Sequence, residues 1–233
     1  MKKVLLPILL ALPFLSGCGT RVHYADSEKY TEFTGKVTIN NNESIIKELQ
    51  IDWISGEVDV QAGNEFTLSE ESLKGSYKPL YYRIDNNTLD IKYCQSDIRL
   101  PSNMSKKLVV TVPYALNKLD LDVTSGKYVV ELGALEEFDI DMTSGRGELK
   151  IGSMKKGEFD LTSGSISLEV LDSRLLESID IDLTSGSFDF KYDGVKGYNL
   201  DRNGKKSSVD GSDTSLEKFS IDFDCTSGSL TII

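Results

Sequence analysis

Histidine is nearly absent from this 233-residue sequence, which holds one histidine, three cysteines and one tryptophan. The lone His23 excludes most triads with a histidine base and metal sites built from several histidines. The sequence also lacks a Gly-x-Ser-x-Gly elbow and a phosphate-binding glycine loop. We therefore expect a protein that is not an enzyme, with no catalytic residues, cofactor or metal ligands.

Positive charge is also scarce. The sequence has 26 Lys and Arg residues against 37 Asp and Glu residues, a formal net charge of -11. Nucleic-acid binding needs clustered basic residues, so this balance argues against a nucleic-acid partner. It also argues against a protein face that lies flat on anionic lipid.

Long hydrophobic runs are missing except at the start of the chain. Lys2 and Lys3 precede an apolar run at 4–15, which is too short to span a bilayer and is typical of a secretory signal. The run ends in Leu15-Ser16-Gly17-Cys18, which resembles the lipobox of bacterial lipoproteins.

The lipobox resemblance implies a lipoprotein signal peptide at 1–17 and lipidation of Cys18, which would become the first mature residue. A plain signal peptide with a chance cysteine, or an uncleaved anchor, is the alternative. Two or three acyl chains suffice for stable attachment to a membrane. Residues 18–35 are polar without sustained periodicity, so they predict a lipidated, flexible tether.

A repeated phrase organises the rest of the chain. An alternating apolar–acidic segment is followed by Thr-Ser-Gly and then by renewed alternation, which indicates half-buried strands joined by glycine corners. The corner glycine stands at Gly126, Gly145, Gly164, Gly186 and Gly228, with a degenerate copy at Gly56.

The spacing of these corners predicts the architecture. Two strands and two corners in about 19–22 residues form one coil of a β-solenoid. We therefore expect an all-β fold, with a single β-solenoid repeat domain at 36–233. A meander or sandwich also alternates, but it has no reason to keep the same corner residues at one spacing.

Two segments interrupt the repeat. Residues 57–125 hold no clear Thr-Ser-Gly but predict further strands, with a tight turn at Asn86-Asn87. Residues 193–217 are rich in Gly, Asp, Ser and Lys and predict an inserted surface loop. That insertion either covers the C-terminal end of the solenoid or leaves the end as a docking edge.

Alignment on the corner glycine places acidic residues in two outward-facing columns. One column holds Asp52, Asp122, Asp141, Asp160, Asp182 and Asp224; the other holds Gln50, Asp120, Asp139, Glu158, Asp180 and Asp222. A solvated acidic face is the favoured interpretation. A calcium column of a structural adhesin is one alternative, and a carbohydrate-active β-helix enzyme with paired carboxylates is another.

Cys94 and Cys225 would remain after lipidation. Cys225 shares the inward column with Leu183, whereas Cys94 has outward parity, so we expect two free thiols. Tyr77, Tyr81 and Tyr82 near Lys74, Lys78 and Arg83 either fill the wide part of the solenoid or form a binding patch.

The sequence resembles the bacterial toast-rack, or "putative-adhesin", family of envelope proteins of unknown function. The resemblance rests on residues 49–58, on the Leu108–Pro113 strand and on the Thr-Ser-Gly coils to Ile232. It implies a β-solenoid attached to a cell envelope, without catalytic residues to transfer. Together with the predicted anchor, it favours a rigid, extracytoplasmic module that binds an envelope protein, a glycan or a surface.

Overall fold

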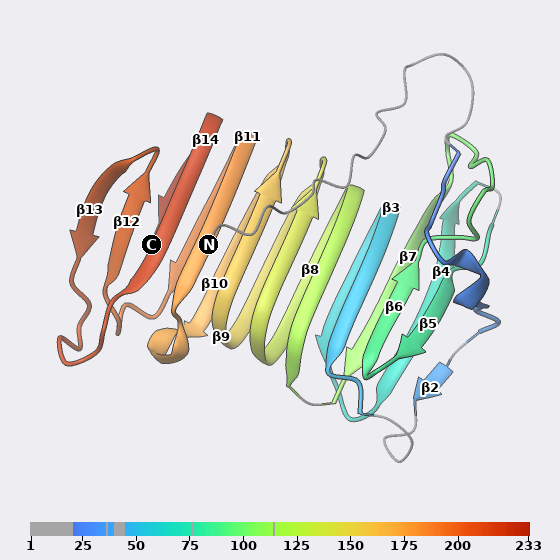
Figure 1. The fold of residues 1–233 in the computed structure, drawn as a ribbon, viewed down its shortest axis with the longest axis horizontal. Helices are drawn as coiled ribbons and strands as arrows, with labels where there is room; N and C mark the ends of the chain where they lie inside the picture. Colours follow the sequence, from blue (N-terminus) through green and yellow to red (C-terminus); the bar gives the residue numbers. More distant parts are fainter. Residues whose placement is uncertain (1–20, 36, 40–44, 76, 114) are drawn as a thin grey trace.

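The computed structural model of the protein describes residues 21–35, 37–39, 45–75, 77–113 and 115–233. These residues form one sheet of 14 strands (Figure 1). The helical elements in these ranges are two three-residue turns, η1 (Ser27–Lys29) and η2 (Ser173–Leu175), and no helix there could cross a membrane. The expected all-β fold is confirmed; the predicted signal peptide and Cys18 lie outside the described residues.

Six strands form the body of the sheet by parallel pairing. They are β3 (Glu48–Ala62), β8 (Leu116–Met142), β9 (Arg146–Leu161), β10 (Ser165–Asp172), β11 (Ser178–Tyr192) and β14 (Phe219–Ile232). The other eight strands lie at the two ends: β1 (Thr31–Glu32), β2 (Val37–Ile39), β4 (Phe66–Lys74), β5 (Tyr81–Asp85), β6 (Thr88–Lys92), β7 (Ser105–Val112), β12 (Tyr198–Arg202) and β13 (Lys205–Val209).

The alternation of side chains in each strand explains its burial. In β11, Ile179, Ile181 and Leu183 are buried while Asp180 and Asp182 are exposed, as the period of two requires. The buried residues of successive strands form one continuous core. Its largest members are aromatic, and they include Trp53, Tyr93, Tyr128, Phe138, Phe159, Phe188 and Phe190.

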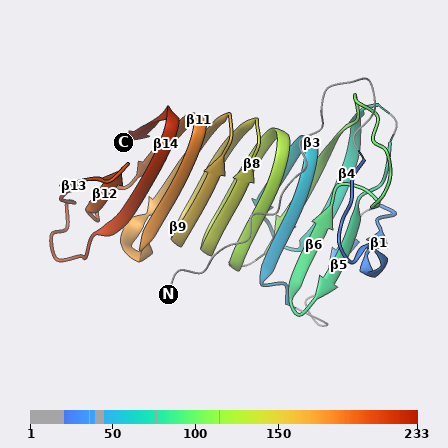
Figure 2. The same cartoon turned by 45° about the horizontal axis from the view of Figure 1, so that its top comes forward.

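β3, β8, β9, β11 and β14 each contribute to two layers because they bend along their length (Figure 2), whereas β10 contributes to one layer. In β3, residues 48–52 pair with β6, whereas residues 56–62 pair with β7. Gly56 lies at the bend with a φ of 115°. The equivalent Gly126 and Gly186 have φ of 141° and 127°, angles that residues other than glycine rarely adopt.

The close approach of the neighbouring strand in the sheet also requires glycine at the bend. A Cβ atom on Gly126 would lie 2.1 Å from the carbonyl oxygen of Gly56, its partner in the ladder. A Cβ on Gly186 would lie 2.1 Å from the carbonyl oxygen of Gly164. The bends therefore stack directly on each other, with no space for a side chain between them.

The N-terminal end agrees with the strands predicted between the first two repeats. β5 and β6 form the expected hairpin, and Asn86 and Asn87 turn the chain with φ of 48° and 71°. Such positive angles are those of a tight hairpin turn. β4 pairs with β7, which returns the chain to the regular strands.

Residues 21–33 differ from the flexible tether that we expected across 18–35. Val22 and Phe33 are buried, and their amides donate hydrogen bonds to the carbonyl oxygens of Ile98 (3.1 Å) and Leu80 (3.0 Å). β1 also pairs with β5. Irregularly spaced apolar residues hold this segment against the end of the sheet, a pattern that a search for periodicity does not detect.

The predicted surface loop at 193–217 is only partly a loop. Its residues 198–209 form the hairpin β12–β13, and β12 pairs in parallel with the first half of β14. The hairpin thus extends the sheet at its C-terminal end, because Tyr198 and Leu200 stand in register with the buried Phe219 and Ile221.

Cys94 and Cys225 are free thiols, as expected. The outward orientation predicted for Cys94 is wrong, since Cys94 is fully buried. β6 ends at Lys92, so the strand alternation that we extended to residue 94 no longer applies there. Cys225 is partly buried against the core.

Candidate functional site

A pocket of about 420 Å³ lies at the N-terminal end of the sheet, between the segment that precedes β1 and the strands β5 and β6. Three tyrosines and Lys92 line it together with small polar residues. The lining residues are Tyr24, Ser27, Glu28, Tyr30, Tyr81, Lys92, Cys94, Gln95, Ser96 and Asp97. Its volume is within the range of small-ligand sites, about 300–1,000 Å³.

Backbone contacts fix the wall that the N-terminal segment contributes. The Asp97 amide donates to the carbonyl oxygen of Val22 at 2.7 Å, and the Tyr24 amide donates to the Ser96 hydroxyl at 2.9 Å. At the rim, His23 Nδ1 lies 3.1 Å from the Asp97 carboxylate. The His23 contact lowers the pKa of Asp97. His23 therefore has an acidic neighbour in space that the sequence did not reveal.

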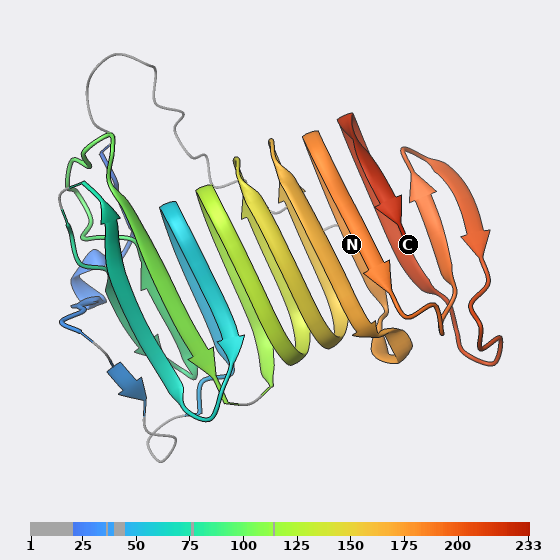
Figure 3. The same cartoon turned by 180° about the vertical axis from the view of Figure 1, so that it is seen from behind.

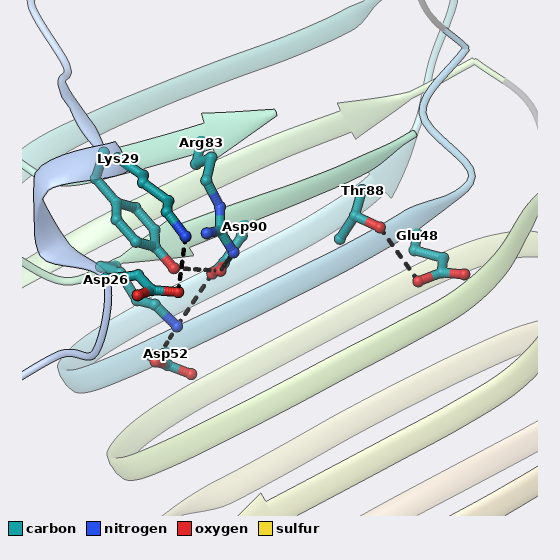
Figure 4. Close-up of polar contacts among 9 residues, drawn as sticks. Asp26, Lys29, Glu48, Asp52, Arg83, Thr88 and Asp90 are labelled. Atoms are coloured by element: carbon teal, nitrogen blue, oxygen red, sulfur yellow. Dashed lines mark hydrogen bonds and ion pairs between the residues drawn. The ribbon is translucent and has the colours of Figure 1, made fainter. Parts of the chain in front are cut away.

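A charged cluster underlies the tyrosines. Figure 4 shows Arg83 of β5 beside Asp90 of β6, with Asp52 of β3 close to them. Lys92 Nζ lies 2.5 Å from the Asp52 carboxylate and 3.1 Å from that of Asp90, and Arg83 lies 3.3 Å from Asp90. Two cations thus balance two carboxylates. The Tyr30 hydroxyl donates a further hydrogen bond to Asp90.

Ionisation in this cluster follows from those contacts. Burial, followed by the hydrogen bond to Asp90, raises the pKa of Tyr30 to about 12. Burial opposes the charge on Lys92, but Asp52 and Asp90 outweigh it and raise the Lys92 pKa. Tyr30 is therefore neutral and Lys92 charged at physiological pH.

The same two cations also occupy faces of the tyrosine rings. Lys92 Nζ lies 5.6 Å from the Tyr24 ring centroid and 5.7 Å from that of Tyr30, and the Arg83 guanidinium lies 4.9 Å from the latter. These are cation–π distances. The structure thus already places protein cations where an external ammonium group would bind.

The chemistry of the lining favours a neutral, polar ligand. Lys92 is neutralised by two carboxylates, so the pocket offers no surplus positive charge to an anion, and Glu28 and Asp97 at the rim would repel one. Partly buried tyrosines offer apolar rings with polar tips, and Ser27, Gln95 and Ser96 offer hydrogen-bonding groups.

The predicted tyrosine patch is only partly assembled. Tyr81 lines the pocket, and its hydroxyl donates to Glu32 at 2.9 Å. Tyr77 is 49% exposed and bonds Glu70, and the Tyr82 ring packs edge-on against Phe33. Arg83 belongs to the charged cluster, so the six residues do not form one surface.

The acidic columns are present as strand registers. Asp52 pairs with Asp122, Asp141 with Asp160, and Asp182 with both Asp160 and Asp224. The second column is similar: Gln50 pairs with Asp120, Asp139 with Glu158, and Asp180 with Glu158 and Asp222. At the N-terminal end, Lys92 and Asp90 of β6 continue the columns opposite Asp52 and Gln50.

Partial burial and mutual repulsion raise the carboxyl pKa at several column positions, Asp122 and Asp160 among them. Burial, followed by the charges of its neighbours, raises the pKa of Asp122 to about 6 and that of Asp160 to about 7. One cation, Lys118, lies 3.5 Å from Asp120 and 3.1 Å from Asp139. Protons and lysines thus offset the repulsion at these positions.

The described ranges bring together no group of three or more His, Cys, Asp or Glu residues that could hold a metal ion. Each column carboxylate has neighbours above and below it in the sheet rather than around a common centre. This arrangement lacks the six to eight oxygens that calcium needs around one ion.

Our sequence analysis missed Tyr24, Tyr30, Asp90 and Lys92. Asp90 and Lys92 could have been found, because they alternate with Leu89 and Ile91 as the column residues alternate in other strands. Tyr24 and Tyr30 had no such signal, since they reach the pocket through an irregular segment that only the fold brings back to β6.

The family model described as Toastrack DUF4097 matches residues 46–233. A "putative cell adhesion protein" from Clostridium sporogenes superposes with a TM-score of 0.53 at 11% identity, covering 88% of this chain and 99% of its own. A "putative adhesin" from Bacteroides fragilis gives a TM-score of 0.35 at 13% identity, covering 87% and 99%. No curated protein sequence matches. Because the family model matches most of its length, the chain belongs to the Toastrack family.

Proposed function

We propose that this protein is a non-catalytic module of the bacterial cell envelope, held at a membrane by lipid on Cys18, that binds a neutral glycan. The observation that carries the proposal is the pocket lined by Tyr24, Tyr30 and Tyr81, with its balanced charges. The apolar face of a sugar ring packs on aromatic rings, while its hydroxyls need several polar partners. The pocket offers both.

Extracytoplasmic attachment is the second part of the proposal, and the sequence from Lys2 to Cys18 supports it. The cell-adhesion description of the Clostridium sporogenes protein agrees with a surface role. If Cys18 carries lipid, only a few residues separate the anchor from Val22, which is buried in the folded part. The pocket end of the sheet would then lie near the membrane.

The third part concerns the architecture that presents the pocket. We take the sheet as a β-solenoid with about 19–22 residues per coil and Thr-Ser-Gly corners. The strand registers support this, because Lys127 pairs with Arg146, Arg146 with Ser165, and Ser165 with Ser187, each the residue after its corner glycine. Such stacked coils make a rigid support.

Glycan binding is testable with purified full-length protein and a panel of neutral disaccharides, beginning with chitobiose, by isothermal titration and saturation-transfer NMR. Tyr81→Ala removes a pocket wall, and we expect at least about a tenfold loss of affinity. Tyr77→Ala is the matched control, since Tyr77 is exposed outside the pocket. Equal effects of both variants, or no sugar signal from the unaltered protein, would overturn the proposed ligand.

Anchoring has a separate test. Cells that express the protein with a labelled fatty acid should incorporate the label, and Cys18→Ser should abolish incorporation and release the protein from membranes. Label that persists in Cys18→Ser would contradict the predicted modification. Release of reducing sugar from envelope polysaccharide would instead favour the enzyme alternative.

A further inference from the structure

The two halves of the last long strand, β14, end the sheet differently. The first half, Phe219–Phe223, is covered by β12. The cover stops at Asn203, whose side chain accepts a hydrogen bond from the Cys225 amide at 3.0 Å and donates one to the Cys225 carbonyl oxygen at 3.3 Å. Beyond Cys225, no strand in the described part of the chain pairs with the outer side of β14.

Hydrogen bonds at the end of β14 show which of its backbone groups face outward. The Ile233 amide donates to Phe190 at 2.9 Å, and its carbonyl oxygen accepts from Tyr192 at 3.2 Å, so both Ile233 groups face β11. In a parallel ladder the N–H and C=O groups of one residue both point toward the same neighbouring strand, and those of the next residue both point to the opposite side. Leu230 and Ile232 therefore present their N–H and C=O groups at an open edge.

The open edge of β14 has no charged side chains to prevent another strand from pairing with it, whereas the outer strand β13 does. β13, the outermost strand of the other layer, begins with the exposed Lys205 and Lys206, and lysines are a common protection against edge-to-edge pairing. Residues 226–233 contain no charged side chain. Leu230 and Ile232 are only partly buried, so the core also ends here incompletely covered.

The hairpin β12–β13 extends two strands beyond this open edge in the other layer (Figure 3). Tyr198 and Leu200 of β12 follow the register of buried residues in β14 and are themselves partly buried. The C-terminal end of the sheet is thus a step. Its base is the inward face of β12, and its wall is the backbone edge of residues 226–232.

The step excludes a second copy as the natural occupant. Two copies paired through this edge would be related by a two-fold axis perpendicular to the layer. In the other layer, the first half of the second copy's β14 would then lie about 4.8 Å, one strand spacing, from the first half of this β14. β12 already fills that position. An extended segment of a different chain, one or two strands wide, meets no such obstacle.

We propose that this step binds an extended, cationic segment of another protein, which adds a strand to β14 along residues 226–232. Main-chain hydrogen bonds to Leu230 and Ile232 supply the binding, as in other strand-addition complexes. Apolar residues at alternate positions of the segment would cover Leu200 and Tyr198. Positive charge is required because the chain carries -11 and because the acidic column ends at Asp224, just before this edge.

The test uses a nine-residue peptide with valine at alternate positions and lysine or threonine between them. A peptide of the same composition with consecutive valines is its control. Full-length protein is titrated with each peptide by fluorescence anisotropy, and amide hydrogen exchange is followed by NMR. We expect binding of the alternating peptide only, with slower exchange at Leu230 and Ile232.

A substitution at Ile232 tests the backbone hydrogen bonds of the edge without changing the pairing between β14 and β11. Its N–H faces outward, so Ile232→Pro removes a donor from the edge while the pairing with β11 remains. Ile232→Val keeps the donor. We expect Ile232→Pro to weaken peptide binding at least about tenfold and Ile232→Val less than about threefold.

Three results would overturn the proposal. The first is equal binding of both peptides, and the second is binding of the alternating peptide without slower exchange at Leu230 and Ile232. The third is a dimer, seen by sedimentation without peptide, in which the same two amides exchange slowly. Because the exchange measurement uses unaltered protein, an unfolded Ile232→Pro variant would not decide the outcome, and sugar binding at the distant pocket is scored separately.

Discussion

The ammonium of Lys106 lies 3.0 Å from the carboxylate of Glu70 in the interior of the sheet, where both side chains are almost completely buried. Lys106 Nζ also donates to the carbonyl oxygens of Lys78, at 2.9 Å, and Tyr93. The ring centroids of Tyr93 and Trp53 lie 4.4 and 5.0 Å from it. A single inward lysine thus joins β4, β7 and the aromatic core.

Removal of one partner of this pair should be costly. We expect Lys106→Met to destabilise the protein by about 3–5 kcal/mol, because the Glu70 carboxylate would remain buried without its counter-ion. The measurement is urea unfolding followed by circular dichroism. The double variant Lys106→Met with Glu70→Leu should recover a large part of the loss. A double variant as unstable as the sum of both single variants would contradict this coupling.

Gly126→Ala should also be destabilising, by about 2–4 kcal/mol, since the backbone angle of 141° and the 2.1 Å approach to Gly56 both exclude a Cβ atom. Gly133→Ala is the matched control on the same strand, because a Cβ there meets nothing within 4 Å. We expect less than about 0.5 kcal/mol for it. Thermal unfolding of both variants gives the comparison, and similar losses would refute the stacking explanation.

The acidic columns predict a stability that falls as pH rises. Burial and neighbouring charges raise the pKa of Asp160 from 3.8 to about 7, so the folded state binds more protons than the unfolded state between those values. The contribution of Asp160 is fully present below about pH 4 and is lost as pH rises through 7. The melting temperature should therefore be higher at pH 5 than at pH 8.

Asp160→Asn removes the charge and should reduce this pH dependence, with a gain of about 1 kcal/mol at pH 8. This gain is below the full linkage value because much of the partly covered side chain remains accessible to solvent, which screens its charge. Asp189→Asn is the control, since Asp189 pairs with Ser167 and Thr231 rather than with carboxylates. An equal gain in both variants would indicate a general charge effect instead of the column.

Thiol labelling should show that both cysteines are free and that the fold protects Cys94. Burial raises the pKa of Cys94 to about 11, so little thiolate forms at neutral pH, and its sulfur is inaccessible in the folded state. In a Cys18→Ser protein we expect two reactive thiols after denaturation with no reductant. Under native conditions Cys94 should react at least about a hundredfold more slowly than Cys94 in denaturant. A single thiol or none in the denatured protein would show a disulfide instead.

Strand alternation, the stacked glycines and the acidic columns could all be predicted from the order of residues alone. These features repeat, and each repeat is set by local rules: side chains alternate along a strand, and glycine alone accepts both the backbone angle and the close approach at Gly126. The hairpin at Asn86-Asn87 was predictable for the same reason, since the turn depends on neighbouring residues only.

The features that do not repeat depend on tertiary contacts. Tyr24 and Tyr30 reach β6 from an irregular segment, and the inward Lys106 meets Glu70, which lies 36 residues earlier in the chain. The hairpin at 198–209 covers one half of β14 and leaves the other open. These contacts join segments far apart in the chain, and no local preference specifies them. The pocket, the buried ion pair and the open edge therefore arise only in the folded sheet.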